Sequence, residues 1–572
     1  MRPRFLLLRR TLARKTQSPP SLLLTSSSSL RTFMQKSSST PSSCSQSSPT
    51  PRVRRRPQNP YLSVTNTSLS RVRHMTTERK AQLKHDIKAG LKFVAYLYIG
   101  VGIVGLCSYL INQESLEKQF PTPREWSFLT RRAFRNACEE MYLANPEAQI
   151  QWGVIIRWMA EVQGRLTSPQ IDGQGVLELP PDRPILARDV SAKSEAWRRG
   201  YFESWMIMAK ALEQVDGWMR DDKRDLIFPP EMVIGPSNPN PRPIPAGISG
   251  APKEEDCTPA FKVTPNDFYL AILYTVGFSN KQRIEAGLAY ASWLDFKGMA
   301  GPASIVYEEA LNLALSEVSP ETVDTETWTL KENAPSLPSE NLLTTLTAYA
   351  EHRARNNDVT SALPIFISLL KARRSLPPDT SPPYRSQNHG MLNIVKDLLI
   401  PRPYPPPPPD GTSPPTRDAK ELCAEAALSL HIGEIMYTSQ ESNHREEGLS
   451  WTREAVDIAE EQLHKLNPAV EAHKPARISC RECLATGLSN WQTMVSRLAK
   501  EEAVKKEEAE KAGKKDSSNS SWFGLWGGKS IKEDLSRWAA EEKVIEERQR
   551  RAKDLIDDLE PPKTGWAVLL SM

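Results

Sequence analysis

Apolar side chains recur with helical spacing along most of the chain behind residue 120. One stripe advances in steps of three or four positions: Trp197, Tyr201, Trp205, Met208 and Leu212. A second stripe advances in similar steps: Trp152, Ile155, Met159, Val162 and Leu166. Such steps place all members of a stripe on one face of an α-helix. Because no convincing run of alternating apolar and polar residues accompanies these stripes, we predict an all-α body.

Polar residues and prolines mark where the predicted helices stop. Ser339 is placed to cap a helix that begins near Glu340, and the polar residues 356–358 should end it. Residues 226–260 and 401–415 are rich in proline, which removes a backbone donor and clashes with the preceding helical turn. We therefore expect no α-helix in either stretch and an extended polyproline segment in the second. We interpret both stretches as loop insertions. The alternative is that such a stretch binds in an aromatic groove of a partner protein.

Three pairs of predicted helices between about residues 280 and 465 share small and aromatic residues at matching places. A small residue lies midway along each leading helix, and the second helix follows the spacing A-x3-aromatic-x2-A, although the third pair lacks the aromatic residue. The residues expected to pack these pairs are Gly287, Tyr290, Ala303, Tyr307, Ala310, Ala350, Ala362, Phe366, Gly433 and Ala455. The pattern resembles the tetratricopeptide repeat, which implies helical hairpins stacked into a superhelix with a concave face. Ordinary helical hairpins are the alternative.

A single run in the chain is long and apolar enough to cross a membrane. Residues 93–111 hold nineteen uncharged, mostly apolar residues, close to the ~20 that span the hydrocarbon core. The run contains Gly100, Gly102 and Gly105 with the spacing of a dinucleotide-binding motif, but that motif needs a strand before it and an amphipathic helix after it. We interpret these glycines as sites of close helix packing instead. The prediction is one transmembrane helix and no nucleotide cofactor.

The charge distribution indicates a targeting sequence at the N-terminus. Residues 1–77 contain fourteen Lys or Arg and no Asp or Glu, which is typical of a mitochondrial presequence. The remainder carries 60 basic and 69 acidic residues, a net charge of −9, so the overall value of +5 does not indicate a nucleic-acid surface. Residues 78–92 hold five basic and two acidic residues. By the positive-inside rule, this flank stays in the matrix and the bulk of the chain lies in the intermembrane space.

The C-terminal part, residues 499–572, is predicted as a charged helical extension of a repeat domain that covers residues 112–498. Residues 499–515 contain Glu-to-Lys pairs four positions apart, which stabilise a solvated helix. The polar loop that follows includes the aromatic segment 522–528. Its large side chains are expected to contact a partner or a membrane surface, or else to fold back on the repeats: Trp522, Phe523 and Trp526.

The sequence contains few candidates for catalytic or metal-binding residues. Cys480 and Cys483 form a CxxC motif, but a structural zinc site normally needs two such pairs and a thioredoxin-like site needs a strand before the helix. Seven cysteines without regular spacing also argue against a disulfide framework. We interpret Cys480 and Cys483 as ordinary buried cysteines. Oxidation of this pair in the intermembrane space is the alternative. Since no phosphate-binding loop, nucleophile elbow or HExxH motif occurs, we predict no catalytic residue, no metal site, no cofactor and no small-molecule substrate.

The acid-free leader, the span at residues 93–111 and the repeat residues together resemble a known arrangement. It is similar to the fungal mitochondrial inner-membrane adaptor proteins of the i-AAA protease, which carry tetratricopeptide domains. The resemblance implies a single-pass, non-catalytic protein that binds protein clients and presents them to a membrane protease for quality control. An assembly or import factor for an inner-membrane complex, using the same groove for folded partners, is the alternative.

Overall fold

The computed structural model describes residues 77–142, 150–180, 183–244, 250–332, 336–378, 404–438, 442–467, 470, 473–516 and 528–557. Contacts divide the chain into two units with a boundary inside the first helix, after Leu106. The described residues are mostly helical, which confirms the all-α prediction at the level of fold class.

Thirteen α-helices lie in the described part of the chain. The helices are α1 (Thr77–Gln119), α2 (Phe128–Tyr142), α3 (Trp152–Thr167), α4 (Glu195–Gln214), α5 (Pro265–Tyr274), α6 (Asn280–Phe296), α7 (Ala300–Leu315), α8 (Glu340–Arg355), α9 (Val359–Arg374), α11 (Ala419–Thr438), α12 (Ser442–Lys465), α13 (Lys474–Asp516) and α14 (Gly528–Asp557). The predicted amphipathic stripes lie on α3 and α4. Every member of both stripes is buried except Trp152, which is half-buried.

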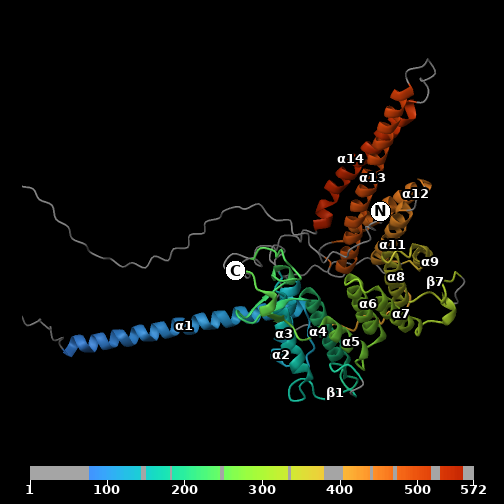
Figure 1. Ribbon diagram of the computed structural model, residues 1–572. Helices are drawn as coiled ribbons and strands as arrows, with labels where there is room; N and C mark the ends of the chain where they lie inside the picture. Colours follow the sequence, from blue (N-terminus) through green and yellow to red (C-terminus); the bar gives the residue numbers. More distant parts are fainter. Residues whose placement is uncertain are drawn as a thin grey trace, which may run out of the picture. The chain divides into compact units, whose positions relative to one another are not determined.

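From α2 onward, helices that are neighbours in sequence pack against each other (Figure 1). The pairs α2–α3, α6–α7, α8–α9 and α11–α12 each consist of two helices joined by a loop, and the contacts α3–α4, α5–α6, α7–α8 and α9–α11 join one pair to the next. Each of these helices therefore packs mainly against its neighbours in sequence.

The ten residues predicted to pack the hairpins are all buried. On α6, a Cβ atom built at Gly287 would lie 3.6 Å from the Cβ atom of Ala310 on α7, so the two helices cross with only small side chains between them. On α7, the ring of Tyr307 lies 4.8 Å from the ring of His352 on α8. Small residues therefore face each other within one pair, and aromatic rings fill the space between pairs.

Two clusters of buried apolar residues run through the helices. The first reaches from Trp126, just before α2, to Ile435 on α11. The second joins α11, α12, α13 and α14, and includes Trp491 and Trp538. Helix α11 contributes residues to both clusters. The break that we predicted at residue 499 falls within the continuous helix α13, and α14 packs on α13.

The described loops contain seven short strands, which the sequence did not predict. They form a two-stranded sheet of β1 (Leu177–Glu178) with β2 (Arg188–Asp189), a three-stranded sheet in the order β4 (Leu226–Phe228), β3 (Met219–Asp221), β5 (Cys257–Pro259), and a pair of β6 (Val323–Asp324) with β7 (Thr329–Leu330). All pairs are antiparallel. Segments of two or three residues are too short to show the alternation that identifies a strand.

The helix ends follow the predicted signals. The Oγ atom of Ser339 accepts a hydrogen bond of 3.2 Å from the backbone N–H of Leu342, which caps α8. Helix α8 ends at Arg355 with Asn356 as its C-cap, and Asn357 takes a left-handed backbone conformation with φ of 65°. The described residues of the stretch 226–260 hold two strands and two short 3-10 turns, η1 (Pro230–Met232) and η2 (Glu254–Asp256), and no α-helix.

Helix α1 is 43 residues long and is the one described helix that is long and apolar enough to cross a membrane. Its apolar side chains from Phe93 to Ile111 are exposed to a large extent. Gly100, Gly102 and Gly105 lie within the continuous helix, where a Cβ atom at each would meet nothing within 4 Å. They are therefore not in the strand-turn-helix context of a dinucleotide site.

Candidate functional site

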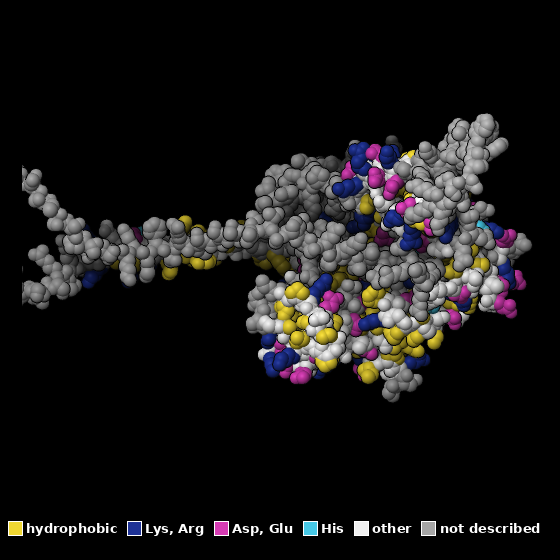
Figure 2. Space-filling view, turned by 45° about the horizontal axis from the view of Figure 1, so that its top comes forward, with side chains coloured by type: hydrophobic (Ala, Val, Ile, Leu, Met, Phe, Trp, Pro, Cys, Tyr) yellow, Lys and Arg dark blue, Asp and Glu magenta, His cyan; other side chains and the backbone are white. Residues whose placement is uncertain are grey.

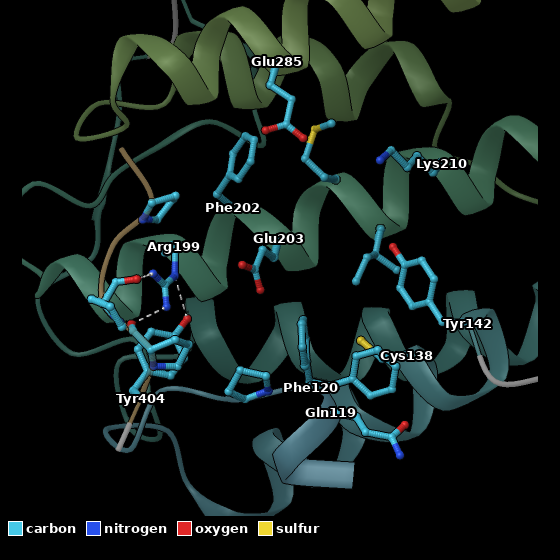
Figure 3. Close-up of a pocket in the computed structure, with 17 residues that line it drawn as sticks. Gln119, Phe120, Cys138, Tyr142, Arg199, Phe202, Glu203, Lys210, Glu285 and Tyr404 are labelled. Atoms are coloured by element: carbon cyan, nitrogen blue, oxygen red, sulfur yellow. Dashed lines mark hydrogen bonds between the residues drawn. The ribbon is translucent and has the colours of Figure 1, made fainter. Parts of the chain in front are cut away.

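A cavity of about 510 Å³ lies among α2, α4, α6 and two non-helical segments of the body (Figure 3). One of these segments directly follows α1, and the other is part of the proline-rich stretch. The residues that line the cavity are Gln119, Phe120, Pro121, Phe134, Cys138, Tyr142, Arg199, Phe202, Glu203, Met206, Ile207, Lys210, Glu285, Tyr404, Pro405, Pro406 and Pro408.

Helical periodicity explains which side chains reach the cavity. On α2, Phe134, Cys138 and Tyr142 follow one another in steps of four and so share a face. On α4, the stripe that begins at Trp197 packs into the core. The cavity is lined by positions just beside that stripe, from Phe202 to Lys210. Helix α4 is thus buried on two faces, one toward the core and one toward the cavity.

Residues 404–411, which we call the strap, close one side of the cavity. Arg199 on α4 holds it through all three of its guanidinium nitrogens. Its Nε atom donates to the Tyr404 hydroxyl at 3.1 Å, and its two Nη atoms donate to the carbonyl oxygens of Pro405 and Pro406 at 3.0 Å each (Figure 3). The guanidinium also lies 4.3 Å from the centre of the Tyr404 ring. One arginine therefore fixes three successive residues of the strap.

The rest of the strap is held by the first turns of two further helices. The Nζ atom of Lys281 on α6 donates to the carbonyl oxygen of Pro409 at 2.8 Å. The Nδ2 atom of Asn341 on α8 donates to the carbonyl oxygen of Asp410 at 2.9 Å. Gly411 takes a φ of +72° against Asn341, where any Cβ atom would clash. Side chains from α4, α6 and α8 thus bind the main chain of one extended segment, whose proline rings remain exposed.

The cavity contains a carboxyl group in an apolar setting. Figure 3 shows Glu203 directed into the space between the strap and Lys210. Burial raises the pKa of Glu203 to about 7, Arg199 lowers this pKa, and Glu285 raises it. Among the described residues, none forms a hydrogen bond or an ion pair with Glu203. Glu285 comes from the neighbouring helix α6 and is exposed.

Cys138 and Tyr142 also line the cavity, but their surroundings do not activate them. Burial is the main cause that raises the pKa of the Cys138 thiol well above its ordinary value, and the charge of Glu203 raises it further. The pKa of Tyr142 is also raised, to about 12, by desolvation beside the cavity and by nearby acidic groups, although the side chain as a whole is exposed. A thiol that stays protonated is a poor nucleophile.

A carboxylate–histidine pair lies elsewhere in the body. The Nδ1 atom of His352 on α8 lies 2.8 Å from an Oδ atom of Asp295 on α6. Both side chains are more than nine-tenths buried, and the amide of Asn356 lies 3.3 Å from the other ring nitrogen of His352. The pair connects two helices in the core. Neither side chain lines the cavity.

A disulfide joins Cys423 on α11 to Cys480 on α13, with their Cα atoms 5.0 Å apart. Our interpretation of Cys480 as an ordinary buried cysteine was wrong, because its partner lies 57 residues away and not in the CxxC motif. Cys483 is buried and free, as expected. Within the described ranges, no group of three or more His, Cys, Asp or Glu side chains could hold a metal ion.

The predicted site residues and the cavity occupy different places. None of the ten hairpin-packing residues lines the cavity. The aromatic segment with Trp522, Phe523 and Trp526 lies outside the described residues. The sequence did not reveal Arg199, Lys281 and Asn341 as functional residues. A run of prolines offers hydrogen-bond acceptors but no donors, so it requires donors from elsewhere in the chain.

Comparison with known proteins gave no match to a family model, a curated protein or a solved structure.

Proposed function

We propose that this protein is a membrane-anchored, non-catalytic adaptor whose helical body binds extended polypeptide segments. The main support for this proposal is the strap. Its carbonyl oxygens accept hydrogen bonds from Arg199, Lys281 and Asn341, which lie on three different helices. Donors aimed at main-chain carbonyls recognise a polypeptide without regard to its sequence. Such a surface suits loosely folded clients of many kinds.

The arrangement of the helices supports a divergent tetratricopeptide-like array as the scaffold of this surface. Consecutive pairs pack in order along the chain, with Gly287 against Ala310 in one pair and Gly433 against Gly448 in another. In an array of this type, the leading helices line a concave face that is free for a ligand. The strap contacts α4, α6 and α8, of which α6 and α8 are leading helices in this scheme.

The mitochondrial inner membrane is the proposed location. The acid-free leader and the apolar stretch of α1 support import and a single span, with the N-terminus in the matrix and the body in the intermembrane space. The disulfide between Cys423 and Cys480 supports a compartment that permits thiol oxidation. On the face drawn in Figure 2, basic and acidic side chains are interspersed, as expected for a protein that does not bind nucleic acid.

The proposed partners are protein clients and a membrane protease that receives them. A membrane anchor holds the groove close to membrane-bound clients and raises their effective concentration. The test is affinity purification of the full-length protein from detergent-solubilised mitochondria, with the partners identified by mass. We expect protease subunits together with a varied set of membrane proteins. Recovery of intermediates of one inner-membrane complex instead would favour an assembly or import factor, and absence of both would refute the proposal.

A further inference from the structure

The cavity beside the strap has walls that suit one particular type of side chain. Phe120, Phe202 and Tyr142 give it an apolar, aromatic lining. Glu203 and Glu285 bring two carboxyl groups to it from α4 and α6 (Figure 3). A cavity with both an apolar lining and carboxyl groups matches a lysine or arginine side chain, whose methylene stem buries against apolar surface while its charged head binds a carboxylate.

Among the described residues, the basic groups of the cavity form no ion pair with these acids, and Arg199 favours the ionised form of Glu203 only through its nearby charge. Arg199 directs its three nitrogens to the strap, at distances of 3.0 to 3.1 Å from their acceptors. Lys210 is the other cation in the lining. A neutral apolar guest would leave Glu203 without a partner in a desolvated place, and an anionic guest would meet two carboxyl groups. A cationic guest supplies the ion-pair partner that Glu203 lacks.

We infer that this cavity binds a lysine or arginine side chain of an extended client segment that lies beside the strap, with Glu203 and Glu285 as its carboxylate partners. The inference rests on the proposed function and specifies the client chemistry: a basic residue flanked by apolar residues. Membrane-protein segments carry such residues where an apolar span meets its basic flank, so they fit a membrane-anchored receptor.

The protonation of Glu203 gives the interaction a pH dependence. Arg199 and Lys210 face this carboxyl from its own helix, Glu285 from α6, Cys138 and Tyr142 from α2, and Tyr404 from the strap: these are the titratable and charged groups around it. Burial raises the pKa of Glu203 to about 7, so a cation binds the ionised form that predominates above that pH. Capture of a basic segment should strengthen as the pH rises through 7.

The test uses full-length protein in lipid nanodiscs and two fluorescent peptides that differ in a single side chain. The first peptide carries a single arginine between apolar residues, and the second carries neutral citrulline in its place. We expect the Glu203→Gln/Glu285→Gln variant to bind the arginine peptide roughly tenfold more weakly and the citrulline peptide as before. Glu285→Gln alone is a second variant that spares the fold, because Glu285 is exposed. It should weaken arginine binding by a smaller factor.

Glu213→Gln is the matched control, because Glu213 is a half-buried glutamate of the same helix that accepts a hydrogen bond from Tyr269 and does not line the cavity. This variant should bind both peptides like the original protein. Equal affinity of the original protein for both peptides would overturn the inference while leaving the adaptor proposal intact. Displacement of the arginine peptide by spermine at equal concentration would overturn it as well, since the guest would then be a free polycation. Absence of binding to any polypeptide would refute both proposals.

Discussion

Gly433 on α11 and Gly448 on α12 face each other at backbone contact. A Cβ atom built on Gly433 would lie 2.8 Å from the carbonyl oxygen of Gly448, and one built on Gly448 would lie 2.6 Å from the carbonyl oxygen of Gly433. It would also lie 2.6 Å from the backbone nitrogen of Tyr437. Backbone atoms cannot move aside as a side chain can, so any residue other than glycine at either position forces the two helices apart.

The first prediction follows from this contact. Gly448→Ala should lower the free energy of unfolding by ~1–3 kcal/mol, because the added methyl group overpacks a helix crossing. Urea denaturation followed by circular dichroism measures the change. Gly164→Ala in α3 is the control, since its Cβ atom would meet nothing within 4 Å, and it should leave stability unchanged or raise it by up to ~1 kcal/mol. Equal effects of the two substitutions would contradict the close approach of α11 and α12.

The second prediction concerns the disulfide. Cys423→Ser should lower the free energy of unfolding by ~2–5 kcal/mol, because the bond between Cys423 and Cys480 closes a long loop and restricts the unfolded chain. Cys257→Ser is the control, since Cys257 is free and only half-buried. Peptide mapping without reductant should recover Cys423 joined to Cys480, and Cys483 should react with an alkylating agent only after unfolding. A bond between Cys480 and Cys483 would be incompatible with this structure.

The third prediction concerns pH. Burial raises the pKa of Glu434 on α11 to about 7, His431 lowers this pKa, and the side chain accepts a hydrogen bond from Asn490. The carboxyl is protonated in the folded state and ionised in the unfolded state between about pH 4.5 and 7. The folded state thus binds the extra proton, and stability must fall as the pH rises through this window.

Glu434→Gln removes this titration and can still accept the hydrogen bond from Asn490. Relative to the original protein, the variant should gain stability on the order of 2 kcal/mol between pH 5 and pH 8. Thermal or urea unfolding at a series of pH values measures the difference. Glu321→Gln at an exposed position is the control and should show no such trend. A difference that stays constant with pH would show that Glu434 is ionised in the folded protein.

The fourth prediction concerns topology. The protein should remain in the membrane pellet after carbonate extraction of mitochondria, because α1 contains a stretch that is long and apolar enough to span the bilayer. Added protease should reach residues after 112 only once the outer membrane has been ruptured. Digestion in intact mitochondria would place the anchor in the outer membrane. Release by carbonate would show that α1 does not span a membrane.

Local patterns in the sequence predicted much of the helical fold. The stripe from Trp197 to Leu212, the Ser339 cap and the break at Asn356 all lie where expected, because each depends on residues within a few turns of one another. The short strands escaped prediction since their pairing depends on loop geometry. Strand β3, for example, pairs with β5 near the far end of the proline-rich stretch, more than thirty positions along the chain.

The cavity could not be predicted from the sequence. Arg199 and Pro406 are separated by 207 positions, and nothing near either residue indicates the other. The same holds for Cys423 and Cys480, where the CxxC motif drew attention to the wrong partner. Both contacts depend on which helices stack together, which is decided by the packing of the whole body. The acidic residue Glu203 is likewise one of many on a helix until the strap covers it.

Binding of unfolded polypeptide by the full-length protein in nanodiscs tests the adaptor proposal most directly. One fluorescent test protein is offered in two states, native and permanently unfolded by reduction and alkylation, and binding is followed by fluorescence anisotropy. We predict saturable binding of the unfolded form and recovery of the test protein uncleaved. Failure to bind the unfolded form, or cleavage of the test protein by the purified protein, would contradict the proposal of a non-catalytic adaptor.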